Sequence, residues 1–156
     1  MSGGRDMLSL FDRLIDNAPD QQSEERDDEA IQNEMKLGLR RDLEGLLNAK
    51  KPHAAWLSRA DGLERTILGF GLPDLSTDDF SSPSVRERIR RLISSTIRLH
   101  EPRLSRVEVE TDGGPTSTGV RFRISAVMMI ERGEEAVIYD ASLRPTDREF
   151  AVRLAR

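Results

Sequence analysis

Histidine and cysteine, which most often bind metals or act in catalysis, are rare or absent in this chain, and its sequence contains no catalytic or metal-binding pattern. The two histidines, His53 and His100, lie far apart and outside any H-E-x-x-H arrangement, and the sequence contains no cysteine. Because a zinc site needs several ligands that converge at fixed spacing, we expect no metal and no cofactor. No G-x-S-x-G sequence exposes a nucleophilic serine, so the sequence gives no signal for a Ser-His-Asp triad.

Two other segments have simple interpretations. Residues 69–74 read Gly-Phe-Gly-Leu-Pro-Asp, which lacks the Lys-Ser/Thr end of a phosphate-binding loop and is better explained as a turn with positive φ angles. Arginines recur from Arg86 to Arg98, and such a face can neutralise phosphates. No aromatic residues lie between them and the net charge is −4, so we expect a solvated face first, an acidic protein partner second and nucleic acid last.

Glu101 is the one acidic residue in a special setting, because Pro102 disfavours helical geometry at Glu101 and ends a helix there. An unpaired acid at a helix C-terminus costs roughly 0.3–1 kcal/mol, and Arg98 or Arg103 is placed to relieve it. Taken alone, the pattern favours a surface ion pair worth under about 1 kcal/mol. The alternative is a rigid corner that presents a carboxylate and a forked guanidinium to a partner.

The composition of the chain indicates one soluble domain. At 156 residues it has the length of a single domain, which buries roughly 70% of its unfolded surface. Its core must be aliphatic, since aromatic residues make up only 4% of the sequence. No apolar run approaches the ~20 residues that cross a bilayer, and no secretory signal pattern begins the chain. We therefore expect a cytoplasmic protein without direct membrane insertion.

The first 29 residues are predicted to form a separate, mobile unit. Residues 7–15 have apolar side chains at helical spacing, which predicts a short amphipathic helix. Residues 16–29 contain a proline and a run of acids, which should stay solvated. We therefore divide the chain into a docking helix with an acidic linker, residues 1–29, and one domain, residues 30–156.

Helical spacing of apolar residues dominates the first half of this domain. It predicts helices over residues 30–48 and 84–99, and a short helix is expected over 62–68. The helix over 84–99 has two possible starts. One is a capping box of Ser84 with Glu87, and the other is a serine followed by a proline at the first helical position, residues 82–83.

Alternating apolar spacing dominates the second half of the domain. It predicts four strands, around residues 107–109, 120–128, 137–143 and 150–154. The segments between them carry the Gly, Pro and Asp of tight turns, which join antiparallel neighbours. Helices followed by a meander of strands predict an α+β fold, with the N-terminal helices packed on one face of a small antiparallel sheet of about four strands.

Four short motifs, in order along the chain, resemble those of one known family. The sequence Glu101-Pro102-Arg103-Leu104 resembles the hallmark of the baseplate wedge family shared by contractile phages and type VI secretion systems. Residues 9–14 (SLFDRL) are similar to the N-terminal signature of its secretion-system branch, called TssE. Residues 42–50 (DLEGLLNAK) and 71–75 (GLPDL) resemble two further family motifs. Phe70 stands where the family has tyrosine, and His100 where an aromatic residue is usual.

The resemblance implies a structural, non-enzymatic subunit that is similar to the first layer of the tail sheath. Its strand-rich end would pair with sheath strands and seed their polymerisation, as exposed strand edges allow. The corner of Glu101, Pro102 and Arg103 is implied to contact the helical core bundle of the baseplate wedge. Implied partners are other wedge subunits, of the TssF, TssG and TssK types, and tail sheath subunits, in a membrane-docked baseplate in the bacterial cytoplasm.

Two expectations remain open beside this one. Leu10, Phe11 and Leu14 are expected either to dock into a partner groove or to pack back onto their own domain. The alternative function is a lysozyme-like hydrolase that cleaves peptidoglycan with Glu101, since some family members have carried a lysozyme label. For the scaffold, Ile93→Ala should destabilise the fold, whereas Arg103→Ala should leave folding nearly intact and break assembly.

Overall fold

The structure, a computed structural model, describes residues 28–52, 62–130 and 133–155. Its helices are α2 (Asp28–Asn48), the short 3₁₀ helices η2 (Leu63–Arg65) and η3 (Ile67–Gly69), and α3 (Pro83–His100). Its strands are β1 (Leu104–Thr111), β2 (Val120–Ile130), β3 (Gly133–Leu143) and β4 (Phe150–Leu154). The strands form one antiparallel sheet in the order β1-β2-β3-β4. No helix among the described residues is long and apolar enough to span a membrane.

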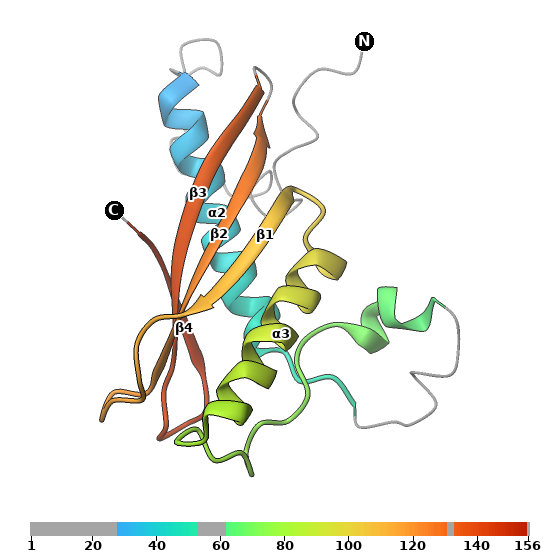
Figure 1. Ribbon diagram of the computed structural model, residues 1–156. Coiled ribbons are helices and arrows are strands. Elements are labelled where there is room, and N and C mark those ends of the chain that lie inside the picture. The colour runs from blue at the N-terminus through green and yellow to red at the C-terminus, as the bar shows by residue number, and fades with distance from the viewer. Residues whose placement is uncertain (1–27, 53–61, 131–132, 156) are drawn as a thin grey trace.

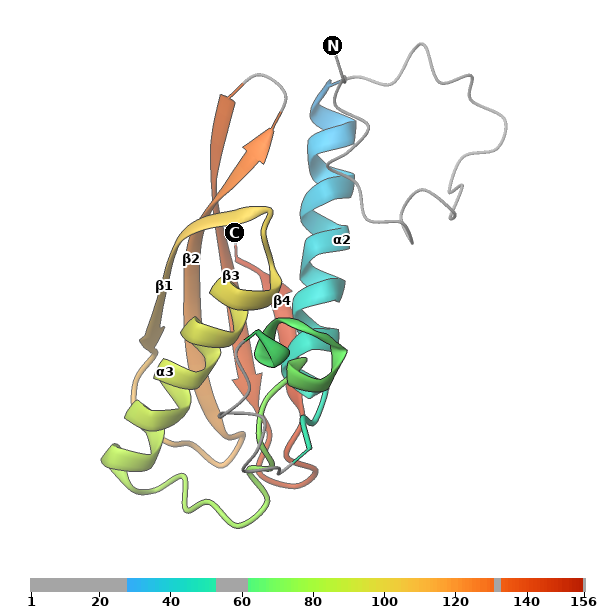
Figure 2. The ribbon, with the colours of Figure 1, turned by 90° about the vertical axis from the view of Figure 1, so that its right-hand side faces the viewer.

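Helices α2 and α3 pack on the same face of the sheet (Figures 1 and 2). Helix α3 lies mainly along β1, and α2 lies mainly along β4. Buried and exposed residues alternate along β2 and β3, because one face of the sheet meets the helices and the other meets solvent. The predicted α+β fold, with N-terminal helices on one face of a four-stranded antiparallel sheet, is confirmed.

The start of α3 follows one of the two predicted alternatives. Pro83 occupies the first turn and Ser82 is the N-cap residue, although the hydroxyl of Ser82 meets that of Ser84 and caps no backbone group. The capping box is wrong, because Glu87 turns along the helix to bind Arg90. Proline suits this position, since its ring fixes a helical φ and its missing N–H would be unpaired there.

The predicted short helix over residues 62–68 is wrong in type, because this segment forms the two 3₁₀ turns η2 and η3. The glycine-containing turn after it is confirmed at Gly71, which has φ +101°. A Cβ there would lie 2.1 Å from the carbonyl oxygen of Ala49, so only glycine fits. The close approach lets Leu72 pair with Lys50 in a short parallel bridge, which holds the loop against the end of α2.

One hydrophobic core lies between the helices and the sheet. The predicted aliphatic character is confirmed in α3, whose Ile89, Ile93 and Ile97 are completely buried. Phe122 of β2 and Tyr139 of β3 are the largest fully buried side chains in the described part of the chain. Burying one large aliphatic side chain contributes about 1.5–3 kcal/mol, so these positions hold α3 to the sheet.

Tyr139 links the sheet to α2 through its hydroxyl, which donates to the carbonyl oxygen of Lys36 at 3.0 Å. The ring is fully buried. Burial raises the pKa of the Tyr139 phenol above its ordinary value of 10.0, with smaller contributions from the charges of Glu101 and Glu135, while Arg103 lowers it. The phenol of the folded protein therefore stays protonated at pH values at which an exposed tyrosine ionises.

Replacing Ile93 by alanine should lower the free energy of unfolding by about 2–5 kcal/mol, because it removes buried methylene groups and leaves a cavity. Urea unfolding followed by circular dichroism measures this loss. Ser95→Ala on the exposed face of the same helix is the matched control and should change stability by less than about 0.5 kcal/mol. Equal losses in the two variants would contradict the predicted packing.

The pKa shift of Tyr139 predicts a loss of stability at alkaline pH. The unfolded chain releases the phenolic proton near pH 10 and the folded chain holds it, so this contribution is present below about pH 10 and is lost as the pH rises above it. Tyr139 is the single tyrosine of the chain, so tyrosinate absorbance reports on it alone. Ionisation near pH 10 in the folded protein, as in urea, would contradict the prediction.

Candidate functional site

The predicted corner lies where α3 ends and β1 begins. Glu101 is the residue after the last helical turn, and its N–H still donates to the carbonyl oxygen of Ile97 at 2.8 Å. The chain then reverses, with the N–H of Leu104 donating to the carbonyl oxygen of Glu101 at 3.2 Å. Pro102 cannot continue the helix. The predicted helix end at Glu101 is thus confirmed.

The charged groups of the corner bind each other. The Nε and Nη2 atoms of Arg103 donate to the two carboxylate oxygens of Glu101, each at 2.6 Å, and the backbone N–H of Arg103 adds a third bond at 3.2 Å. The same Nη2 atom donates to Oδ2 of Asp42, on α2, at 2.7 Å. The bond to Glu101 raises the pKa of Arg103 above its ordinary value. The result is a forked, charge-assisted pair that also ties the corner to α2.

This ion pair is buried, which corrects the prediction of a surface pair. The side chains of Glu101, Arg103 and Asp42 are 8%, 20% and 26% exposed. Removing one partner of a buried pair leaves a charge without compensation in a poorly solvated place. The expectation that Arg103→Ala leaves folding nearly intact is therefore revised, because the Glu101 carboxylate depends on that guanidinium.

Only part of the corner faces solvent. Pro102 is exposed, whereas Arg103 is only partly exposed and donates to Glu101 and Asp42 through Nε, Nη2 and its backbone N–H. The carboxylate of Glu101 points inward to the guanidinium. A partner at the corner would thus meet the proline ring and the exposed part of the Arg103 side chain, whereas the sequence alone predicted that it would meet both charged groups.

The geometry gives Glu101 no suitable position for acid–base chemistry. A general acid must reach the leaving group of a substrate, whereas both oxygens of this carboxylate are engaged by Arg103 inside the protein. Among the described residues no group of three or more His, Cys, Asp or Glu side chains could hold a metal ion. His53 lies outside the described residues, and His100 contacts a loop carbonyl.

The other predicted motifs lie at the C-terminal ends of α2 and α3 and in the loop that contacts both ends. His100 lies against Phe70 in an edge-to-face contact, with ring centroids 5.4 Å apart, and its Nε2 lies 3.1 Å from the carbonyl oxygen of Gly69. Asn48, at the end of α2, bonds to both backbone groups of Phe150 on β4. The motifs at residues 42–50, 69–75 and 100–104 thus connect neighbouring elements of the fold. Residues 9–14, with Leu10, Phe11 and Leu14, lie outside the described residues.

The arginine face of α3 is bonded within the chain. Arg86 and Arg98 donate to backbone carbonyls, and Arg88, Arg90 and Arg91 pair with carboxylates. Carboxylates thus neutralise Arg88, Arg90 and Arg91, whereas Arg86 and Arg98 are bound by neutral carbonyl oxygens. The arrangement favours the predicted charged face over a nucleic-acid site, but Arg90 and Arg98 turn towards β1, which the sequence pattern did not indicate.

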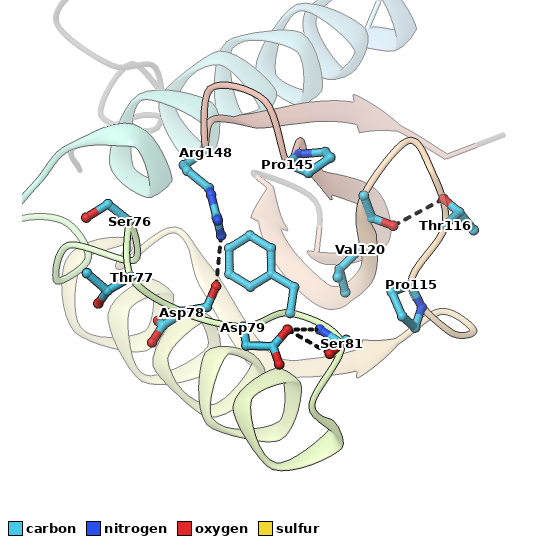
Figure 3. Close-up of a pocket in the computed structure, with 12 residues that line it drawn as sticks. Ser76, Thr77, Asp78, Asp79, Ser81, Pro115, Thr116, Val120, Pro145 and Arg148 are labelled. Atoms are coloured by element: carbon cyan, nitrogen blue, oxygen red, sulfur yellow. Dashed lines mark hydrogen bonds between the residues drawn. The ribbon is translucent and has the colours of Figure 1, made fainter.

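A pocket of about 450 Å³ lies at the other end of the sheet, where the loop before α3 meets two strand turns (Figure 3). The guanidinium carbon of Arg148 lies 4.3 Å from the centre of the Phe80 ring, and its Nη1 donates to the carbonyl oxygen of Asp78 at 3.0 Å. Hydrogen bonds from Ser81 lower the pKa of the Asp79 carboxyl. Because these polar groups bind one another, we interpret the lining of the pocket as a set of contacts that hold the surrounding loops together.

Comparison with known proteins gives one result for this chain. The family model described as "Baseplate wedge protein gp25" matches residues 33–132. No curated protein and no solved structure matches the chain. The matched segment contains most of α2, all of α3, the corner of Glu101, Pro102 and Arg103, and strands β1 and β2. Because the match covers more than half of the chain, the predicted resemblance is confirmed: the protein belongs to the gp25 family of baseplate wedge proteins.

Proposed function

We propose that this protein is the TssE-type baseplate subunit of a bacterial type VI secretion system, where it joins the wedge core to the tail sheath and seeds sheath polymerisation. The observation that carries the proposal is membership of the baseplate wedge family together with the corner of Glu101, Pro102 and Arg103. The sequence SLFDRL at residues 9–14 favours the secretion-system branch over a phage. The role is structural, in keeping with the family.

The geometry of the corner supports a docking role. A docking surface is precise when its residues are held rigidly before the partner arrives, because less conformational entropy is then lost on binding. Three hydrogen bonds between Arg103 and Glu101 and one between Arg103 and Asp42 hold the turn in one conformation. Pro102 is exposed at its tip. We assign this turn as the contact with the helical core bundle of the wedge, formed by subunits of the TssF, TssG and TssK types.

The N-terminal motif supplies a second contact in this proposal. Leu10, Phe11 and Leu14 would bind a groove on another baseplate subunit, reached through the acidic segment that precedes α2. An amphipathic helix in a groove is a common mode of peptide recognition. The assembly would be in the cytoplasm, docked at the membrane through the other baseplate components.

Loss of the Arg103 side chain should destabilise the fold. We expect Arg103→Ala to lower the free energy of unfolding by about 3 kcal/mol, the lower end of the range for broken buried pairs, since Arg103 is partly exposed. Urea unfolding measures the loss. Adding Glu101→Gln should recover part of it, because the second change removes the uncompensated charge. The control is Arg106→Ala, whose ion pair with Glu134 is exposed and worth under about 1 kcal/mol.

A substitution at Pro102 should separate assembly from stability. Pro102→Lys puts a long cation at the exposed tip and leaves the ion pair in place, so stability should fall by less than about 1 kcal/mol. Affinity purification of the tagged full-length protein from its host should then recover fewer wedge subunits. Pro115→Lys, at an exposed proline in the turn at the other end of β1, is the matched control and should recover wedge and sheath subunits as the unchanged protein does.

The outcomes of this purification bear on the proposal in different ways. Recovery of wedge and sheath subunits by the unchanged protein and by Pro115→Lys, with loss of the wedge subunits in Pro102→Lys, would support the corner as the docking contact. Full recovery by Pro102→Lys would show that the corner is not the contact. If the unchanged protein recovers neither kind of subunit under mild conditions, the proposed function fails.

A further inference from the structure

The two outer strands of the sheet differ in how their free edges are occupied. In an antiparallel pair, residues that bond to the partner strand alternate with residues whose N–H and C=O groups point away. Asp112 donates its N–H to the carbonyl oxygen of Arg121 at 2.8 Å, so Glu110 and Glu108, two and four positions earlier, also point towards β2. The residues of β1 whose backbone points away from β2 by this alternation are Val109 and Thr111. Val107 lies in the register irregularity between Ser105 and Glu108, and its carbonyl oxygen accepts from Arg98.

The free edge of β4 is closed by side chains of α2. The amide of Asn48 donates to the carbonyl oxygen of Phe150 at 2.9 Å and accepts from its N–H at 2.8 Å. Glu44 accepts from the N–H of Val152 at 2.9 Å, and Arg40 donates to its carbonyl oxygen at 3.2 Å. The outward donors and acceptors of Phe150 and Val152 are therefore all bonded, and a partner strand at these two residues would have to break all four bonds.

The free edge of β1 is only half occupied. Arg98 donates through Nε and Nη2 to the carbonyl oxygen of Val107, and Arg90 donates through Nη1 to that of Val109 at 3.0 Å. The outward N–H groups of Val109 and Thr111 have no partner within the part of the chain that the structure describes. This edge thus offers two donors directly, and the carbonyl oxygens of Val107 and Val109 are held only by arginine side chains.

The charges beside β1 show which partner fits this edge. Arg90 and Arg91 are both held by Glu87, whose pKa they lower to about 2, with the Arg90 hydrogen bond as the largest cause. Arg98 has no carboxylate partner among the described residues, so its charge is not neutralised within them. It lines a shallow groove of about 510 Å³ along α3, together with Arg90, Arg91 and Leu99. The charge complementary to this groove is negative.

We propose that the outer edge of β1, and not that of β4, is the surface on which a partner chain adds an extended strand, and that this strand carries a carboxylate that pairs with Arg98. The inference rests on the proposed function, because it assigns the strand to a tail sheath subunit. It specifies which edge of the sheet the sheath strand uses, and it names the pairing of a partner carboxylate with Arg98 as the interaction that frees this edge.

An acidic strand can displace the arginines because a carboxylate is a stronger acceptor than a neutral carbonyl oxygen. When Arg98 moves from Val107 to a carboxylate of the partner, the carbonyl oxygen of Val107 becomes free to accept from the partner's backbone. The N–H groups of Val109 and Thr111 would bond to partner carbonyls in the same ladder. Without such a partner the arginines cover the edge, and charged side chains of this kind discourage unspecific strand pairing.

Hydrogen exchange of the full-length protein, with and without purified sheath subunits of its host, tests the proposal directly. The amides of Val109 and Thr111 should exchange at least about tenfold more slowly in the complex, which corresponds to 1.4 kcal/mol. The amides of Phe150 and Val152 should not change. Protection of β4 instead of β1, or of neither strand in a formed complex, would overturn the inference and leave the proposed function standing.

Two substitutions test the groups involved. Thr111→Pro removes an outward N–H at the end of an edge strand, where proline is tolerated, and Arg98→Glu reverses the charge offered to the partner. Each should weaken sheath binding at least about tenfold. Arg153→Glu, at an exposed position of β4, is the control for charge and should bind as the unchanged protein does. Urea unfolding confirms that each variant is folded.

The results separate this inference from the proposed function. Unchanged binding by Thr111→Pro and Arg98→Glu would overturn the inference while sheath binding itself persists. Equal weakening by Arg98→Glu and Arg153→Glu would overturn the specific role of Arg98. If the unchanged protein does not bind sheath subunits at all, the proposed function fails, and the inference fails with it.

Discussion

The guanidinium of Arg103 connects three elements that come from different parts of the chain: α2 through Asp42, the end of α3 through Glu101, and the start of β1 through its own backbone. The reversal from α3 into β1 sets where the first strand of the sheet begins, and β2 to β4 follow it in order. An apolar cluster of similar volume often stabilises a protein as well as a buried ion pair does. A forked pair, however, permits one geometry only, which suits a turn that must keep its shape.

Helix α2 has two structural roles in this arrangement. Its apolar face contributes to the core, and three polar residues of its second half bond to the backbone of β4. Asn48 is the clearest case, because one side-chain amide satisfies both backbone groups of Phe150. A strand edge that is covered in this way resembles the edge of an inner strand, and it gives an approaching chain little reason to pair with it.

The two edges of the sheet thus differ in a way that suits a subunit at the start of a polymer. A sheet with two open edges would pair with itself, and a sheet with two closed edges would accept no strand. In the proposed arrangement one edge is closed by Asn48, Glu44 and Arg40, while the other is guarded by Arg90 and Arg98. Growth would then proceed from one side of the domain and require a partner with the right charge.

The sequence by itself determined the elements of this protein and their order. The change from helical to alternating apolar spacing placed α2, α3 and the four strands, because one-sided burial imposes those periods on any chain. Proline chemistry placed the end of α3 at Glu101 and supplied one of the two starts that the sequence left open. The motif order indicated the family. The 3₁₀ turns of residues 63–69 were mistaken for a helix, because the apolar pattern over so few residues does not distinguish the two.

Only the tertiary structure decided which groups meet. Nothing local indicates that Asp42 binds Arg103, that Asn48 closes β4, or that Arg98 turns back to Val107. The spacing of charges along a helix shows which face they occupy, but a bond to a distant strand depends on how that helix packs. Burial changed the interpretation of Glu101 and Arg103 for the same reason: whether an ion pair is exposed or buried is set by the elements that cover it, and these lie far away in the sequence.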